Sequence, residues 1–234
     1  AHKMQISLMP ESAPSIKGFD IAGFSHPTRE VEGDFFDYLM MADGKIGIAV
    51  ADISGKGLKG AMNAVFVNGM LHEVAKNETS CGKILSVLNS DLYPRMEKLM
   101  YCSLILAVLY QNTRKLEWAN AAQPYPIIRR GDHIFELDSG GDLPLSMKQN
   151  LTYADRELEL QDGDIIVFYT DGIIEATNEA KEMYEIERLE EVIANINPTM
   201  NAKEIIETII KDVTNFVGSE NQYDDITIVV VKSS

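Results

Sequence analysis

Apolar residues along the chain follow two different periods. In some segments β-branched and aromatic residues run continuously or alternate between turn signals such as Asp43-Gly44 and Asp162-Gly163, which is typical of strands. In other segments apolar residues recur every three to four positions, as Met62, Phe66 and Met70 do, which indicates helices with one buried face. The pattern therefore predicts a mixture of strands and helices.

These elements fall in consecutive blocks of one kind. The predicted strands cover residues 19–25, 35–41, 45–53, 101–110, 115–119, 126–130, 133–137, 151–160, 164–170 and 226–232. The predicted helices cover residues 58–76, 83–100, 186–195 and 202–217. Each sheet must bury an apolar face, so segregated blocks favour an α+β fold, a four-layer α/β/β/α sandwich with helices over two antiparallel sheets.

The chain reads as a single domain over residues 1–234. Its composition is 45% hydrophobic and 24% charged, which is enough to bury a sizeable core, and no Pro/Gly/Ser-rich linker divides it. Residues 1–18 begin abruptly in a helix-like pattern, AHKMQISLMPE, and are predicted to be an N-terminal linker or helix remnant. A longer parent protein with an upstream sensor domain is consistent with that beginning.

Charge and cysteine usage exclude several classes of protein. Lys and Arg total 21 against 36 acidic residues, so the net charge of −15 argues against nucleic acid as a partner. Cys81 and Cys102 lie in apolar contexts without C-x-x-C or Cys/His spacing, so we expect buried free thiols in a reducing compartment, the cytoplasm. No apolar run approaches the roughly 20 residues that span a bilayer, which predicts no direct membrane contact.

Four acidic segments carry the candidate chemistry, because each places a carboxylate at the end of an apolar strand beside small residues. They are Glu32-Gly33-Asp34, Asp52-Ile53-Ser54-Gly55-Lys56-Gly57, Thr170-Asp171-Gly172 and Asp224-Asp225-Ile226-Thr227. A carboxylate at such a position loses solvation unless it is paired or bound to a metal. An oxygen-only ligand set suits Mg²⁺ or Mn²⁺ better than zinc. Taken singly, each segment is equally well read as a turn.

Other phosphate chemistries fail on specific positions. A cysteine phosphatase needs C-x5-R, but Val87 and Val108 stand six residues after the two cysteines. The glycines around Lys56 do not form a P-loop, because Gly57 follows the lysine where Ser or Thr is required. Ser54 lacks the G-x-S-x-G frame of a serine nucleophile.

In combination and order, the acidic segments resemble the protein phosphatase 2C superfamily (PPM type), and most closely its bacterial group of stage II sporulation E and sigma-factor regulator phosphatases. The GGDxxD segment of that group is matched by residues 32–37, and D-x-S-G-K-G by residues 52–57. Its TDGxxEAxN is matched by residues 170–178, and its terminal DDxT by residues 224–227. The resemblance covers essentially the whole chain.

The resemblance implies a site for two divalent cations, Mn²⁺ or Mg²⁺. By position, Asp52 bridges the two ions, Asp34 and the Ile53 carbonyl hold one, and Asp171 and Asp224 hold the other. Asp225 is the alternative to Asp224. Asp34, Asp52 and Asp171 are thus the expected catalytic residues. Such a pair of ions activates water for in-line attack on phosphorus.

The function implied is a metal-dependent serine/threonine protein phosphatase. Its substrate would be phosphoserine or phosphothreonine on a regulatory protein, an anti-sigma-factor antagonist in a partner-switching pathway. The alternative from another class is a catalytically weak, phosphatase-like module that binds a partner. Three departures from the group's pattern, Glu32, Gln123 and Ser146, leave the ligand set intact but are expected to reshape contacts around it.

Overall fold

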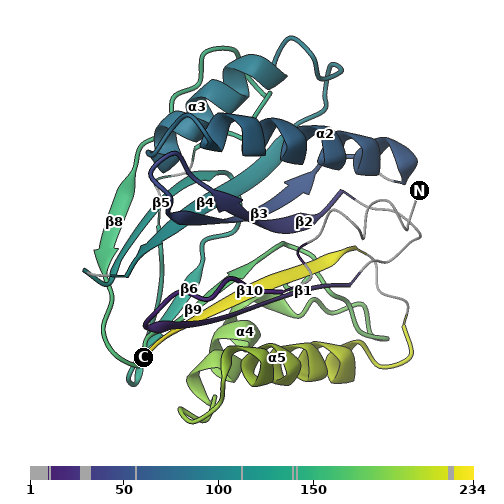
Figure 1. The fold of residues 1–234 in the computed structure, drawn as a ribbon. Coiled ribbons are helices and arrows are strands. Elements are labelled where there is room, and N and C mark those ends of the chain that lie inside the picture. Colours follow the sequence, from purple (N-terminus) through teal and green to yellow (C-terminus); the bar gives the residue numbers. More distant parts are fainter. Residues whose placement is uncertain are drawn as a thin grey trace.

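The computed structural model describes residues 10, 12–26, 33–55, 57–111, 113–138, 140, 142–220 and 224–234. Two five-stranded antiparallel sheets are stacked face to face, and each carries two helices on its outer side (Figure 1). The layers run helices, sheet, sheet, helices. This confirms the predicted four-layer α+β sandwich.

Each sheet combines strands that are not all consecutive along the chain. Sheet I has the order β1 (Phe19–His26), β10 (Ile226–Ser233), β9 (Ile165–Tyr169), β6 (Ile127–Arg130) and β7 (His133–Glu136), under α4 (Glu185–Ala194) and α5 (Ala202–Val217). Sheet II has the order β2 (Phe35–Met40), β3 (Ile46–Ile53), β4 (Cys102–Tyr110), β5 (Lys115–Ala121) and β8 (Arg156–Glu159), under α2 (Leu58–Ala75) and α3 (Cys81–Leu92).

Strand alternation explains why the sequence forms stacked sheets. In β3, Val50 points into the core between the two sheets, whereas Ala51 packs under α2 and α3. In β10, Val229 faces the same central core and Val230 faces α5. Successive side chains of a strand lie on opposite faces, so strands that are apolar throughout must be covered on both sides.

Helix α3 is shorter than predicted. It begins at Cys81, where Ser80 Oγ accepts a hydrogen bond from Lys83 N (3.0 Å), and ends at Leu92. The prediction of a helix to residue 100 was wrong because Pro94 has no N–H with which to continue the helical ladder. Turns follow up to the start of β4.

The predicted strand at 151–160 is a strand only over β8. Before it, Tyr153 N donates to Ser86 Oγ (3.0 Å) and Gly82 N donates to Asp155 Oδ1 (2.6 Å), both on α3. The backbone of this segment is therefore held by the helix layer instead of by a neighbouring strand. Of the predicted N-terminal linker, positions 10 and 12–18 are described, and there they form turns and a single bridge to β1; the rest lies outside the described residues.

Candidate metal centre

Asp52 and Ile53 end β3, and the chain then turns sharply into α2. Ser54 fixes this turn, because its Oγ accepts a hydrogen bond from Tyr101 N (2.8 Å) and its own N–H donates to Tyr101 O (3.0 Å). Gly55 has a φ of 109°, a conformation that is open to glycine and strained for other residues. The turn thereby holds the Asp52 carboxylate and the Ile53 carbonyl at one end of sheet II.

Asp34 is brought to the same place by the neighbouring strand. The antiparallel register of β2 and β3 places Asp34 opposite Asp52. Gly33 is packed against the turn: a Cβ there would lie 2.4 Å from the Ile53 carbonyl oxygen and 3.5 Å from Asp52 Oδ1. Only a residue without a side chain allows this approach, and it brings three predicted ligands together.

The other predicted ligands come from adjacent strands of sheet I. Asp171 lies two residues after the end of β9, and Asp224 lies two residues before β10, which pairs antiparallel with β9. Two hydrogen bonds extend that pairing: Thr170 N donates to Thr227 O (3.0 Å), and Thr227 N donates to Thr170 Oγ1 (3.0 Å). Because β10 packs against β2 and β3, these strand ends meet the Asp52 turn across the sandwich.

Asp224 and Asp225 occupy different parts of this cluster. Asp225 is buried, and its N–H donates to Asp224 Oδ1 (3.0 Å). A Cβ on Gly172 would lie 1.8 Å from the Asp225 carbonyl oxygen, so the two segments interlock through their backbones. The charge of Asp224 acts on Asp171, whereas the charge of Asp225 acts on Asp34. Both charges also act on Asp52, so the choice of Asp224 over Asp225 as a ligand stays a prediction.

Burial and mutual repulsion control the protonation of the cluster. Burial raises the pKa of Asp34 well above its ordinary value, and the negative charges of Asp52 and Asp225 raise it further. The pKa of Asp52 is also raised, first by burial, and its hydrogen bond with Asp34 opposes the shift. Burial and the neighbouring charges thus both favour the protonated form of Asp34 in the metal-free protein.

Asp171 has a comparable environment. Burial raises its pKa to about 7, with contributions from the charges of Asp52, Glu175 and Asp224. Glu175 was not among the predicted ligands, although it belongs to the TDGxxEAxN segment. Its N–H donates to the Asp171 carbonyl (2.9 Å), so the turn after β9 brings this sixth carboxylate to the cluster. The sequence feature that could have identified Glu175 is its position four residues after Asp171, in the turn that follows β9.

These residues fit a divalent cation. Asp34 is 3% exposed, and its Oδ2 has no hydrogen-bond partner, a costly state for a buried carboxyl oxygen. Among the described residues, no lysine or arginine forms a salt bridge with Asp34, Asp52 or Asp171. A carboxylate cluster without an internal counter-charge, with an unsatisfied oxygen, is the donor set that Mg²⁺ and Mn²⁺ prefer.

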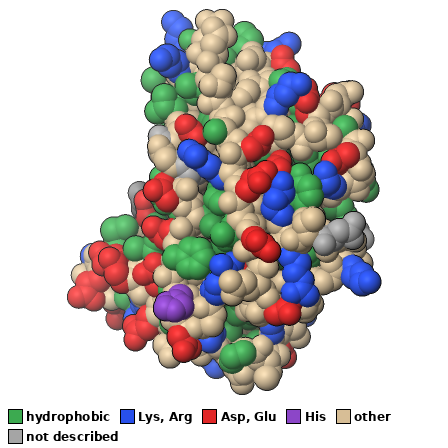
Figure 2. Space-filling view, turned by 90° about the vertical axis from the view of Figure 1, so that its left-hand side faces the viewer, with side chains coloured by type: hydrophobic (Ala, Val, Ile, Leu, Met, Phe, Trp, Pro, Cys, Tyr) green, Lys and Arg blue, Asp and Glu red, His purple; other side chains and the backbone are tan. Residues whose placement is uncertain are grey.

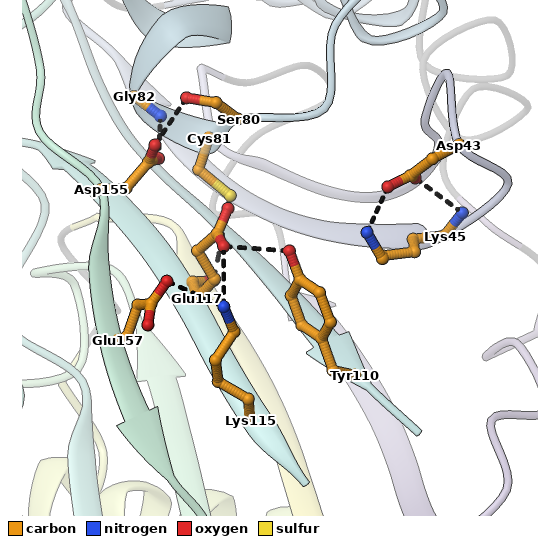
Figure 3. A network of polar contacts seen from close by, with 10 residues as sticks. All are labelled: Asp43, Lys45, Ser80, Cys81, Gly82, Tyr110, Lys115, Glu117, Asp155 and Glu157. Carbon is orange, nitrogen blue, oxygen red and sulfur yellow. Dashed lines mark hydrogen bonds and ion pairs between the residues drawn. The ribbon is translucent and has the colours of Figure 1, made fainter. Parts of the chain in front are cut away.

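A second group of potential ligands lies on the other side of sheet II. Cys81, Glu117 and Asp155 place a thiol sulfur and two carboxylate oxygens within 4.8 Å of one another (Figure 3). Of the residues that the structure describes, these alone form so tight a group of three; Asp52, Asp171 and Asp224, which are predicted to hold one ion, do not. Sequence spacing did not reveal the group, because its members are far apart along the chain.

The carboxylates of this second group are already engaged. Asp155 accepts hydrogen bonds from Ser80 Oγ and Gly82 N, both 2.6 Å, at the start of α3. Glu117 Oε2 accepts from Tyr110 OH (2.9 Å) and Lys115 Nζ (3.3 Å). The group therefore forms a polar network that fastens α3 to sheet II.

On the side of the molecule that carries β8, acidic and basic side chains are interspersed, without a continuous basic patch (Figure 2).

Gln123, one of the three departures from the group's sequence pattern, is linked through Ser103 to the backbone of Asp52. Its Nε2 donates to Ser103 O (3.2 Å), and Ser103 Oγ donates to the Asp52 carbonyl (3.3 Å). Asn120 holds the same loop through two hydrogen bonds to the Gln123 backbone, of 2.8 and 2.9 Å. The substitution thus affects the packing behind the Asp52 strand.

The other two departures are Ser146 and Glu32. Ser146 has a φ of 67°, in the left-handed region that explains the preference for glycine there, and its N–H donates to Asn89 Oδ1 (2.9 Å). Glu32, together with Lys56 of the glycine-rich segment, lies outside the described residues.

Two known proteins are similar to this chain over nearly its whole length. Protein IcfG of Synechocystis is 26% identical over 259 residues, covering 98% of this chain and 40% of that protein. Phosphoserine phosphatase RsbU of Bacillus subtilis is 22% identical over 234 residues, covering 99% of this chain and 68% of that protein. The chain therefore spans less than half of one of these relatives and about two thirds of the other.

The fold has close counterparts among solved structures. The SiaA-PP2C domain of Pseudomonas aeruginosa superimposes with a TM-score of 0.87 at 21% identity, covering 100% of this chain and 94% of that domain. The model of the family described as Stage II sporulation protein E (SpoIIE) matches residues 42–234. This match includes the segments that carry Asp52, Asp171 and Asp224, and the chain belongs to the Stage II sporulation protein E family.

Proposed function

We propose that this domain is a metal-dependent protein phosphatase that hydrolyses phosphoserine or phosphothreonine on a regulatory protein. One observation carries the proposal: acidic segments from four separate parts of the chain converge on one buried cluster whose Asp34 Oδ2 lacks a partner. Membership of the family and the similarity to a protein named phosphoserine phosphatase agree with it.

The residues divide into two ligand sets. Asp34 and the Ile53 carbonyl would hold one cation, Asp171 and Asp224 the other, and Asp52 would contact both. When bound, two Mn²⁺ or Mg²⁺ ions activate water as the nucleophile and offset charge on the phosphoryl oxygens. Glycine at position 33 lets the Asp34 segment approach the turn after Asp52, and glycine at position 172 lets the Asp171 segment approach Asp224 and Asp225.

The substrate is inferred from the relatives. RsbU bears the name phosphoserine phosphatase, and the sequence motifs resemble those of sigma-factor regulators. We therefore propose a phosphorylated anti-sigma-factor antagonist as the substrate, in a partner-switching pathway. Since the chain spans only 40% of IcfG, we also propose an upstream sensor domain in the parent protein.

The proposed setting is the cytoplasm, where a phosphoprotein partner and reduced thiols are both available. Cys81 and Cys102 are buried and unpaired, as expected for that compartment. Among the described residues, every helix is too short or too polar to span a lipid bilayer.

Hydrolysis of a phosphoserine peptide, with and without Mn²⁺, tests the proposal directly. We expect turnover that requires added Mn²⁺ or Mg²⁺, disappears in excess EDTA and returns when the ion is restored, because an oxygen-ligand site binds these ions only moderately tightly. Full activity in excess EDTA would contradict the two-metal assignment. Binding of the peptide without turnover at saturating Mn²⁺ would identify the chain as a partner-binding module instead.

A further inference from the structure

Asp37 makes a compact set of hydrogen bonds beside the metal centre. It lies on β2, three residues after Asp34, and its side chain is only 9% exposed. Its Oδ2 accepts from Asn68 Nδ2 and from His72 Nε2, both at 2.8 Å, and its Oδ1 accepts from Tyr38 N at 2.7 Å. Both carboxylate oxygens are therefore engaged by the chain itself.

Strand alternation separates the tasks of the two aspartates. Residues three apart on a strand point to opposite faces, so Asp37 faces the helix layer while Asp34 faces the space between the sheets. Phe35 and Leu39, which share the face of Asp37, pack in the core under α2 and α3. Asp37 is thus directed away from the aspartate cluster and toward α2.

The partners of Asp37 form one patch on α2. Asn68 and His72 are one helical turn apart, so both project from the same side of the helix. Hydrogen bonds to a charged acceptor are stronger than neutral ones, and a nearly buried carboxylate that loses its partners is strongly disfavoured. A displacement of α2 along or away from β2 would leave the Asp37 charge without these donors.

The first turn of the same helix packs on the metal centre. A Cβ on Gly60 would lie 2.4 Å from the Gly55 carbonyl oxygen and 3.7 Å from the Gly33 Cα. Gly33 in turn touches the Ile53 carbonyl, and Gly55 belongs to the turn after Asp52. The position of α2 therefore bears on the backbone that presents Asp34 and the Ile53 carbonyl.

We propose that Asp37 is a positioning residue for the metal centre: by clamping Asn68 and His72 it seats α2 on β2 and so keeps Asp34 and the Ile53 carbonyl in place to bind a cation. This inference rests on the proposed function, since it assigns Asp37 a part in the same site. Asp37 touches neither ion nor substrate. Its loss weakens cation binding and leaves the chemistry of the loaded site intact.

The test is Mn²⁺ binding by isothermal titration calorimetry, with turnover at saturating Mn²⁺ measured alongside. The variants are Asp37→Asn and the exchange Asp37→Asn/Asn68→Asp, in which the amide at position 37 can donate to a carboxylate at position 68. Glu73→Gln is the matched control, because Glu73 is a carboxylate on the same helix whose side chain is 72% exposed and pairs only with Lys76 among the described residues.

We expect the Kd for Mn²⁺ to rise about tenfold in Asp37→Asn and to return to within about threefold of wild type in the exchange variant, with Glu73→Gln unchanged. Turnover at saturating Mn²⁺ should stay within about threefold throughout. A clamp that served stability alone would lower the melting temperature without this change in Kd. If Asp37→Asn does not fold, His72→Ala removes one donor from a partly exposed position and should raise the Kd in the same direction.

Wild-type affinity for Mn²⁺ in a folded Asp37→Asn protein would overturn the inference, and so would an exchange variant as weak as the single one. Loss of turnover at saturating Mn²⁺ with unchanged Kd would also overturn it, by placing Asp37 in the chemistry. Absence of Mn²⁺ binding by the wild-type domain would instead remove the proposed function, and the inference with it.

Discussion

The backbone of Gly33 lies against the carbonyl oxygen of Ile53, so closely that a Cβ at position 33 would come within 2.4 Å of that oxygen. Gly33→Ala must therefore displace the Ile53 carbonyl or the strand that carries Asp34. We expect at least about a tenfold rise in the Mn²⁺ concentration that gives half-maximal activity, the size of effect seen when the support of a metal ligand is lost.

Gly69→Ala is the control for this substitution. Gly69 lies within α2, and a Cβ there meets nothing within 4 Å. Alanine is favoured over glycine in a helix by up to about 1 kcal/mol, so this variant should be as stable as wild type or more so, with unchanged Mn²⁺ dependence. Equal metal dependence in the two variants would show that the Gly33 contact has no influence on the site.

Asp52→Asn should lower the activity of the protein without lowering its stability. The amide cannot serve two cations as a carboxylate does, so turnover should fall more than about 100-fold, exceeding the effect of changing a residue that only supports a ligand. In EDTA, however, the variant should melt at the same temperature as wild type or higher, because one charge of a repelling cluster is gone. Peptide dephosphorylation and thermal melts check the two halves; wild-type turnover would remove Asp52 from its role.

Asp171 predicts how the stability of the metal-free protein depends on pH. Its folded pKa of about 7 exceeds its ordinary value of 3.8, so the folded state binds the proton more tightly than the unfolded state does. The stabilising contribution is complete below the unfolded pKa and is lost as the pH rises through about 7. In EDTA, the melting temperature should therefore fall from pH 5.5 to pH 8.

Two comparisons isolate this effect. Asp171→Asn, which cannot titrate, should show a smaller fall in melting temperature over the same pH interval. Excess Mn²⁺ should abolish or reverse the fall, because the cation binds the deprotonated carboxylates. A metal-free wild-type protein whose melting temperature is constant or rises between pH 5.5 and pH 8 would contradict the prediction.

Asp224 and Asp225 should differ in the number of ions they help to hold. Asp224 acts on Asp171 and Asp52, whereas Asp225 acts on Asp34 and Asp52 and its backbone is packed against Gly172. We expect calorimetry to find one Mn²⁺ fewer per chain in Asp224→Asn than in wild type, and the wild-type number in Asp225→Asn. The opposite result would assign the ligand to Asp225.

The strands and helices could be predicted because they differ in period, but the predicted buried face of α2 was wrong. Met62 and Phe66 are exposed, and the buried face of the helix consists of smaller and other residues, including Ala64, Val67 and Leu71.

The predicted end of α3 was wrong because Pro94, which the sequence itself shows, interrupts the helix. The predicted strand before β8 was wrong because that segment is held by Ser86 and Gly82 of α3. Such contacts join positions distant in sequence, and local patterns carry no record of them.

The sequence predicted which residues form the candidate site, and their role as ligands stays a prediction. Aspartates at the ends of apolar strands can be recognised in the sequence, and the structure brings Asp34, Asp52, Asp171 and Asp224 into one electrostatic cluster. What surrounds them could not be predicted. In the sequence, Asp37 looks like any polar residue on a strand. Its hydrogen bonds with Asn68 and His72 depend on how α2 lies across sheet II, which the sequence does not show.

The pairing of β1 with β10 gives the domain a direction of mechanical weakness. Ser234 N donates to Gly18 O (2.9 Å), and the ladder runs from Phe19 beside Ser233 to His26 beside Ile226. A force that draws residues 18 and 234 apart loads these hydrogen bonds one after another, as in a zipper, instead of all together in shear. The strand would peel from its outer edge inward and reach Ile226 last.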